Sequence, residues 1–423
     1  MPLVTGGETR AVNLDYAASA PALVSVADHL AELLPLYASV HRGAGYASQV
    51  STSTYENARR IVADHVGARP DDVVVFTRNT TDALGLLASA VPGETVLLDI
   101  EHHANLLPWQ GRRSRIVASA DTLAETLSRL EAELAARPAA LVTVTGASNV
   151  TGEVLPLPEI ATIAHRHGAR LAVDGAQLVP HRLVDLQATG IDYLSFSGHK
   201  AYAPFGAGAL VGRRDWLDAA PPYLAGGGAV SNVTVHGAQW HPTPARHEAG
   251  SPNVLGAATL ARALQELGRL DPDEWSAHDA ALREHLATGL AALPGVRVLR
   301  IFDDSTGAVG VVSFVIDGLP SGLVAAALSA EHGIGLRDGL FCAHPLLARL
   351  GIDAPALRAS FGVGSTRADA DALLAALGAI IATGPAWRYE RAADGEWAPV
   401  DDARHRPEWA SPHEASVRFG CVA

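Results

Sequence analysis

The feature that most constrains the fold is an alternation of short β-branched runs and helical patterns between about residues 50 and 215. Runs such as DVVVFT at 72–77 and AALVTVTG at 139–146 have the composition of buried strands, and helical segments such as 122–137 separate them. Strands that alternate with helices form a mostly parallel sheet covered by helices. The sequence therefore predicts an α/β fold with functional residues at the carboxyl ends of its strands.

Two further regions follow this alternation. Residues from about 276 to 383 indicate a second, smaller α/β unit, with a strand at 309–316 and helices at 321–333 and 368–384. A Gly- and Pro-rich stretch at 220–253 precedes this unit, and an irregular segment of such length is usually functional. The sequence therefore predicts four segments: an N-terminal arm (1–25), a large domain (26–270), a small C-terminal domain (271–384) and a C-terminal extension (385–423).

Charge and composition exclude several classes of partner. The formal net charge is −13, which opposes binding to nucleic acid and to anionic membrane surfaces. The N-terminus has no basic segment followed by an apolar one, and no run approaches the roughly 18 apolar residues of a spanning helix. We therefore expect a cytoplasmic protein whose partners include neither nucleic acid nor membrane.

The sequence also lacks the spacings of metal and nucleotide sites. Its 18 histidines include no His-Glu-x-x-His pattern, and its two cysteines, Cys342 and Cys421, cannot build a thiolate site. Neither a Gly-x-Gly-x-x-Gly motif near the start nor a phosphate-binding Gly-x(4)-Gly-Lys motif occurs. We therefore expect no metal site and no dinucleotide fold.

A lysine and an aspartate follow two of the predicted strands. Lys200 comes directly after the strand at 191–198, and Asp174 lies at the end of the strand at 169–175. Taken alone, Lys200 could be an ordinary surface lysine. A carboxylate at the end of a buried strand, such as Asp174, needs a partner, and a protonated pyridine nitrogen provides one. Together they predict pyridoxal phosphate (PLP) as a Schiff base on Lys200, with Asp174 on the ring nitrogen.

Other polar side chains are expected near this pair. Thr80 and Thr81 lie between a strand and a helical run, where free backbone N–H groups can bind a phosphate, although either threonine could simply cap the helix. Ser197 and His199, after a later strand, favour the phosphate interpretation. His102 follows a strand as well, where an imidazole can stack on a flat ring or exchange protons near neutral pH.

Five short motifs, in order along the chain, resemble those of class V aminotransferases, specifically cysteine desulfurases and selenocysteine lyases. The motifs are HRG at 41–43, EHHAN at 101–105, ASNVTG at 147–152, DGAQ at 174–177 and SGHK at 197–200. The resemblance extends from about residue 13 to residue 377. It implies the fold of type I PLP-dependent transferases, a large domain with a mostly parallel sheet plus a smaller C-terminal α/β domain, and a homodimer with shared active sites.

The resemblance also assigns roles around the cofactor. His102 resembles the histidine that stacks on the ring and takes part in catalysis, and Asn149 and Gln177 resemble partners of the phenolic oxygen. Ser251 matches a hydroxyl that the neighbouring subunit donates to the phosphate. The implied cofactor-binding set is Lys200, Asp174, Gln177, Asn149, Thr80, Thr81, His102, Ser197, His199 and Ser251.

Three residues resemble the substrate-binding set of the same family. Arg358 matches an arginine that grips the substrate carboxylate, a task suited to the fork of a guanidinium group. His41 and Arg337 complete the implied set. The substrate expected from this resemblance is therefore a small α-amino acid.

Cys342 lies where the resemblance places the nucleophile of a desulfurase, whose thiolate would take the substrate's sulfur as a persulfide. His344 is a nearby candidate to lower the pKa of this thiol. The alternative is a small buried hydrophobic residue, and Leu340 and Phe341 are bulkier than the residues that often precede this cysteine in close relatives. Cys421 could receive sulfur, form a disulfide or be idle, and we favour an idle residue.

The function predicted from the sequence is removal of sulfur or selenium from L-cysteine or L-selenocysteine, giving alanine, with catalysis by Lys200, Cys342 and His102. A protein that accepts the sulfur is an expected partner. One alternative keeps the PLP site but makes the enzyme a C–S β-lyase, an epimerase or a β-decarboxylase of another amino acid. The other alternative is a non-catalytic PLP-fold protein that serves sulfur transfer.

Overall fold

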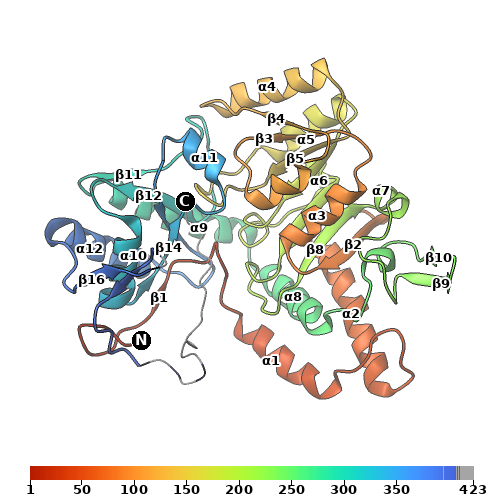
Figure 1. The fold of residues 1–423 in the computed structure, drawn as a ribbon, viewed down its shortest axis with the longest axis horizontal. Helices are drawn as coiled ribbons and strands as arrows, with labels where there is room; N and C mark the ends of the chain where they lie inside the picture. The colour runs from red at the N-terminus through yellow and green to blue at the C-terminus, as the bar shows by residue number, and fades with distance from the viewer. Residues whose placement is uncertain (394, 406, 408, 410–423) are drawn as a thin grey trace.

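A seven-stranded sheet forms the centre of the larger part of the molecule, which a computed structural model describes over residues 1–393, 395–405, 407 and 409 (Figure 1). The strand order is β2-β8-β7-β6-β5-β3-β4, and only β8 runs antiparallel to its neighbours. The predicted α/β fold with a mostly parallel sheet is therefore confirmed. Its strands are β2 (Asp72–Thr77), β3 (Thr95–Leu98), β4 (Ser114–Val117), β5 (Leu141–Thr145), β6 (Arg170–Asp174), β7 (Tyr193–Ser197) and β8 (Gly208–Arg213).

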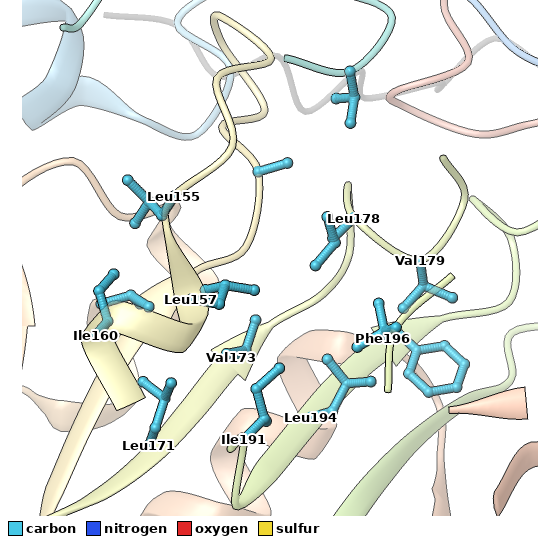
Figure 2. Close-up of a cluster of buried hydrophobic side chains, with 14 of the residues drawn as sticks. Leu155, Leu157, Ile160, Leu171, Val173, Leu178, Val179, Ile191, Leu194 and Phe196 are labelled. Carbon is cyan, nitrogen blue, oxygen red and sulfur yellow. The ribbon is translucent and has the colours of Figure 1, made fainter. Parts of the chain in front are cut away.

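Helices cover both faces of this sheet, so nearly every residue of the central strands β5, β6 and β7 is buried. On one face Leu171, Val173 and Leu194 pack with Ile160 of α5, a cluster that Figure 2 shows in close-up. On the other face Tyr193 of β7 belongs to a cluster that includes residues of α3 and α7. The helices around the sheet are α1 (Val24–Leu33), α2 (Tyr46–His65), α3 (Thr80–Ala90), α4 (Leu123–Ala136), α5 (Leu157–Arg166), α6 (Leu186–Thr189), α7 (Arg214–Ala219) and α8 (Val254–Leu267).

A four-stranded antiparallel sheet forms the smaller part, on the left in Figure 1. Its order is β11-β12-β15-β14, and its elements are β11 (Val296–Val298), β12 (Val311–Ile316), β14 (Arg337–Gly339), β15 (Ala356–Ser360), α9 (Pro272–Ala291), α10 (Ser321–His332), α11 (His344–Arg349) and α12 (Arg367–Thr383). The N-terminal arm joins this part, because β1 (Val12–Asn13) pairs with β13 (Ile334–Gly335). The residue limits of the four predicted segments stay a prediction.

Buried polar contacts join the two parts. Glu153, which lies between β5 and α5, accepts the backbone N–H groups of Ile301 (2.7 Å) and Phe302 (3.0 Å). Asp279 of α9 accepts hydrogen bonds from His181 (2.7 Å) and Arg182 (3.1 Å), which follow β6. Because a buried carboxylate that loses its donors is costly, these contacts hold the two parts in one orientation.

Two hairpins lie outside the predicted elements. The stretch expected to be irregular contains β9 (Val230–Thr234) paired with β10 (Gly237–Trp240). The side chains of both strands are mostly exposed, so the sequence lacks the apolar alternation that predicts a strand. In the C-terminal extension, β16 (Tyr389–Arg391) pairs with β17 (Trp397–Pro399). Within the part of the chain that the structure describes, no helix is long and apolar enough to cross a membrane.

Shortening Leu194 should destabilise the fold, because this side chain is fully buried between β7 and the helices that cover it. We expect Leu194→Ala to lower the free energy of unfolding by about 2–5 kcal/mol. Urea unfolding followed by circular dichroism measures the change. Leu183→Ala is the matched control, because Leu183 is 42% exposed and should change stability by no more than about 0.5 kcal/mol. Equal losses in the two variants would contradict this view of the core.

Candidate active site

A cavity of about 1470 Å³ lies between the carboxyl ends of the large sheet's strands and the smaller part of the molecule. It brings together most of the side chains that the sequence singled out: Thr80, Thr81, His102, Asn149, Asp174, Gln177, Ser197, His199, Lys200, Arg337, Cys342 and Arg358. His41 and Ser251 are not among its lining residues. His41 is instead exposed and bonds Glu56 (2.9 Å), and Ser251 is exposed just before α8. The site therefore draws on segments spread over most of the chain.

Asp174 and Lys200 form the charged centre of the cavity. Asp174 ends β6 and is 3% exposed, and its Oδ1 accepts the N–H of Ala176 at 2.9 Å. Burial raises the pKa of this carboxyl, and the nearby Lys200 charge opposes that rise. Burial also lowers the pKa of Lys200 to about 8, although the Asp174 charge favours the ammonium form. An amine with such a pKa can take up and release protons near neutral pH.

His102 is held as a neutral imidazole at the edge of this centre. Its Nδ1 accepts the N–H of Ala104 at 3.0 Å, so the ring proton of the neutral form is on Nε2. Burial lowers the pKa of His102 to about 3, and the positive charge of Lys200 adds to this effect. A neutral, fixed, flat ring is suited to stacking on another flat ring.

Hydroxyl groups and the first turn of α3 make a polar pocket at one end of the cavity. Ser197 Oγ, at the end of β7, accepts the backbone N–H of Thr80 at 2.7 Å and lies 2.7 Å from Thr80 Oγ1. Asn79 caps α3 by accepting the N–H of Asp82, which leaves Thr80 and Thr81 in the first turn. Hydroxyls beside a helix N-terminus suit an anionic group such as a phosphate.

The two amide side chains of the site both have protein partners. Gln177 Nε2 donates to the carbonyl of Ala17 at 2.7 Å, and Asn149 Nδ2 donates to the carbonyl of Phe341 at 2.8 Å. Each NH₂ group has a second proton, so both amides keep a donor for another oxygen. The bond from Asn149 ties the large sheet's loop to the segment that carries Cys342.

Arg358 of β15 is a buried cation with spare donors. It is 4% exposed, its Nη1 donates to the carbonyl of Asn149 (3.0 Å) and its Nη2 to Asp15 (3.1 Å). Its Nε is buried without a hydrogen-bond partner among the described residues. Burial lowers the pKa of this guanidinium, and Asp15 opposes that shift. A buried donor of this kind suits a bound carboxylate.

The loop between β14 and α11 presents Cys342 in a strained conformation. Phe341 and Cys342 have positive φ angles of 53° and 52°, which cost roughly 1–2 kcal/mol per residue. The carbonyl of Cys342 accepts the N–H of His103 at 2.8 Å, in addition to the bond from Asn149 to Phe341. The buried Phe341 ring lies 5.2 Å from the Arg358 guanidinium carbon. These contacts hold the loop against the segments that follow β3 and β5.

The sequence did not predict the contacts that two residues, His103 and Phe341, make at this site. His103 was passed over in favour of His102, although its ring lies edge-on to His344, with the ring centres 4.6 Å apart. Phe341 was recognised only as unusual bulk, whereas its ring packs beside the Arg358 cation. The second histidine of the EHHAN motif could have been considered as a site residue. Its contact with Cys342 could not be predicted, because Cys342 is more than 200 residues away and no spacing rule links the two.

Comparisons with a family model, with known proteins and with solved structures all lead to the same family. Residues 12–373 match the family Aminotransferase class-V. A probable cysteine desulfurase from Halobacterium salinarum is 38% identical, covering 88% of this chain and 92% of that protein. One from Mycolicibacterium paratuberculosis is 37% identical over 80% of this chain, and the match spans only 50% of that longer protein. The apo structure of a cysteine desulfurase from Thermococcus onnurineus has a TM-score of 0.81 and 32% identity, over 88% of this chain and 95% of that one.

Replacing Lys200 with an apolar side chain should stabilise the ligand-free protein. The pKa of Lys200 is about 8 in the folded state against an ordinary value of 10.5, so folding is penalised fully below pH 8. We expect Lys200→Met to raise the free energy of unfolding at pH 7 by about 1–3 kcal/mol. The gain should fall as the pH rises from 8 to 10.5, where the amine is neutral in both states. Urea unfolding at several pH values measures it, and a gain independent of pH would contradict the assignment.

Proposed function

The chain belongs to the class V aminotransferases, and on this premise we propose that it is a PLP-dependent cysteine desulfurase that moves the sulfur of L-cysteine onto Cys342 and releases alanine. One observation carries the proposal: Lys200 of the larger part and Arg358 and Cys342 of the smaller part line one cavity. A base, a carboxylate-binding group and a nucleophile are the parts that this reaction needs. The predicted cytoplasmic location stays a prediction.

The residues of the cavity fit pyridoxal phosphate. Asp174 is a buried carboxylate, so its charge favours a protonated ring nitrogen as partner, and the Ser197 and Thr80 hydroxyls with the first turn of α3 suit the phosphate. The neutral ring of His102 suits stacking on the pyridine. When bound, this cofactor stabilises the electron pair left at the substrate's α-carbon after its proton is removed.

Arg358 and Lys200 would orient the amino acid and move its proton. The unpartnered Nε of Arg358, with its Nη groups, can donate to the substrate carboxylate. Lys200, whose pKa is about 8, can accept the α-proton and return a proton to the substrate. Arg337, which lines the same cavity and pairs with Arg358 across β14 and β15, adds positive charge for the carboxylate.

Cys342 would attack the substrate's sulfur as a thiolate. A negative charge on Cys342 interacts favourably with both Lys200 and Arg358. A new S–S bond forms at Cys342, the Cβ–S bond of the substrate breaks, and its electron pair stays on the β-carbon. A proton then completes the methyl group of alanine. A thiolate of an acceptor molecule or protein takes the outer sulfur as its own persulfide and returns Cys342 as a thiolate. The same steps apply to selenium in L-selenocysteine.

A homodimer with shared active sites follows from the same proposal. Ser251 is exposed and lies outside the cavity of its own chain, as a residue donated to a neighbour's site would be. Large apolar side chains are exposed on α1 and at the start of α2, among them Val24 and Tyr46. Figure 1 shows these two helices next to each other at the lower right. Covering them with a second copy would remove this apolar surface from water.

Cys342→Ser should abolish desulfuration while leaving the cofactor site intact. Without the thiolate, alanine formation from L-cysteine should fall by at least about a thousandfold, as for loss of a catalytic nucleophile. Alanine and sulfide are measured by mass spectrometry and a colorimetric assay. The persulfide itself should be detectable as a mass increase on the Cys342 peptide of the unmodified enzyme.

Cys421→Ser is the matched control, because Cys421 lies outside the described residues and is favoured as idle. It should leave alanine formation unchanged. If Cys342→Ser kept full alanine and sulfide production, the enzyme would be a β-lyase that needs no cysteine nucleophile. An epimerase or a β-decarboxylase would reveal itself by other products, and a non-catalytic protein would show no visible absorption after incubation with PLP.

Arg358→Lys should weaken substrate binding, because an ammonium group cannot donate as a fork to the carboxylate. We expect the KM for L-cysteine to rise about 10–100-fold, the range for loss of a hydrogen bond between charged groups. Steady-state kinetics measure this. Arg297→Lys, an exposed arginine in the same sheet, is the control and should behave as the unmodified enzyme. An unchanged KM in Arg358→Lys would contradict the proposed role.

A further inference from the structure

We propose that the C-terminal hairpin of β16 and β17 is a specificity-determining wall of the active-site cavity, which restricts by size the compounds that can reach Cys342. This extends the proposed function, because it concerns access to the nucleophile. The hairpin lies beyond residues 12–373, which match the family, so that match assigns it no role.

The cavity is larger than one small-molecule site requires. Its volume of about 1470 Å³ exceeds the roughly 300–1000 Å³ of typical ligand pockets. One end contains the cofactor-side residues Asp174 and Lys200, and the lining continues past Cys342 to the start of α10 and to the hairpin. A molecule that reacts with Cys342 therefore has an outer compartment available to it.

Four hairpin residues line this outer compartment: Arg391, Gly395, Glu396 and Trp397. Arg391 and Trp397 pair directly across the two strands. The wall thus combines one large aromatic ring with charges of both signs. Figure 1 shows β16 close to α10 and on the same side of the molecule as β14.

A buried carboxylate fixes the hairpin to α10. Glu331 of α10 is 8% exposed and accepts hydrogen bonds from the backbone N–H groups of Ala386 (2.9 Å) and Trp387 (3.1 Å) and from Tyr389 Oη (2.9 Å). Trp387 Nε1 donates in turn to the carbonyl of Val400 at 2.7 Å, which closes the segment on itself. A carboxylate with three donors makes the hairpin a fixed part of the fold.

Trp397 rests on a glycine that leaves room for its ring. A Cβ atom at Gly322 of α10 would lie 3.0 Å from Trp397 Cδ1 and 3.3 Å from Asp338 Oδ2, so the indole and this carboxylate meet over the helix. Asp338 belongs to β14 and precedes Cys342 by four residues, a span of at most about 14 Å. The ring therefore lies close to the strand that leads to the nucleophile.

The charges beside the ring interact with the same strand. The pKa of Asp338 is raised by burial and also by the negative charge of Glu396, while Arg337 lowers it. The hairpin thus contributes both bulk and charge beside β14. On this proposal, a small compound with charges of both signs, such as an amino acid, passes the wall more readily than a bulky aryl group.

The test compares two maleimides whose N-substituents differ in bulk, N-methylmaleimide and N-phenylmaleimide, on the holoenzyme with Cys421→Ser as background, which also supplies the reference for their intrinsic reactivities. Mass spectrometry of the Cys342 peptide gives the two alkylation rates, and their ratio, phenyl over methyl, reports access. We expect Trp397→Ala to raise this ratio about tenfold, the scale on which pockets discriminate by size. Trp397→Leu, which keeps apolar packing, should raise it less and also serves if Trp397→Ala fails to fold.

Trp409→Ala is the matched control from the same extension, because Trp409 is 88% exposed and does not line the cavity. Its ratio should equal that of the background. An unchanged ratio in a folded Trp397→Ala or Trp397→Leu protein would overturn the proposal, as would an equal rise in Trp409→Ala. Alkylation requires no turnover, so this result is independent of whether the enzyme forms alanine from cysteine.

Discussion

Parallel pairing of β3, β4, β5, β6 and β7 is the constraint on which the rest of the structure depends. Parallel strands need crossover connections, so each strand's carboxyl end and the loop after it lie at the same edge of the sheet. This geometry brings His102, Asp174 and Lys200 to one place although nearly 100 residues of sequence separate the first from the last. It also places the first turn of α3 beside Ser197, across the antiparallel strand β8.

The smaller part of the molecule completes the site by hydrogen bonds to that edge. Arg358 donates to the carbonyl of Asn149, and the amide of Asn149 donates to the carbonyl of Phe341. Asn149, in the loop after β5, thus contacts both the Arg358 cation and the segment that carries Cys342. Arg358 and Asn149 are buried and Cys342 is partly buried. Direct contacts within the protein therefore set the position of the Arg358 guanidinium relative to the Cys342 thiol.

The sequence was sufficient to predict the features that depend on local pattern. The positions of Asp174 and Lys200 at strand ends could be predicted, because strands and their ends are recognised from the pattern of neighbouring residues. His41 and Ser251 were assigned by resemblance, and neither lines the cavity of the single chain, because no local pattern records which distant segments pack together. The β16–β17 hairpin could not be predicted, because its strands have only three residues each and the hairpin is held mainly by a distant carboxylate.

The strained backbone at Phe341 and Cys342 has a consequence for protein engineering. Two donors from outside the loop, the N–H of His103 and the amide of Asn149, satisfy the carbonyl groups of these two left-handed residues, in addition to the loop's own bond from the Ala343 N–H to the Leu340 carbonyl (3.0 Å). A cysteine loop grafted into another scaffold would keep its own turn bond but would lose these two donors. The unit to transfer therefore consists of three discontinuous loops, which carry Cys342, His103 and Asn149. Recombination between homologues would preserve the geometry of Cys342 only when all three loops come from the same parent.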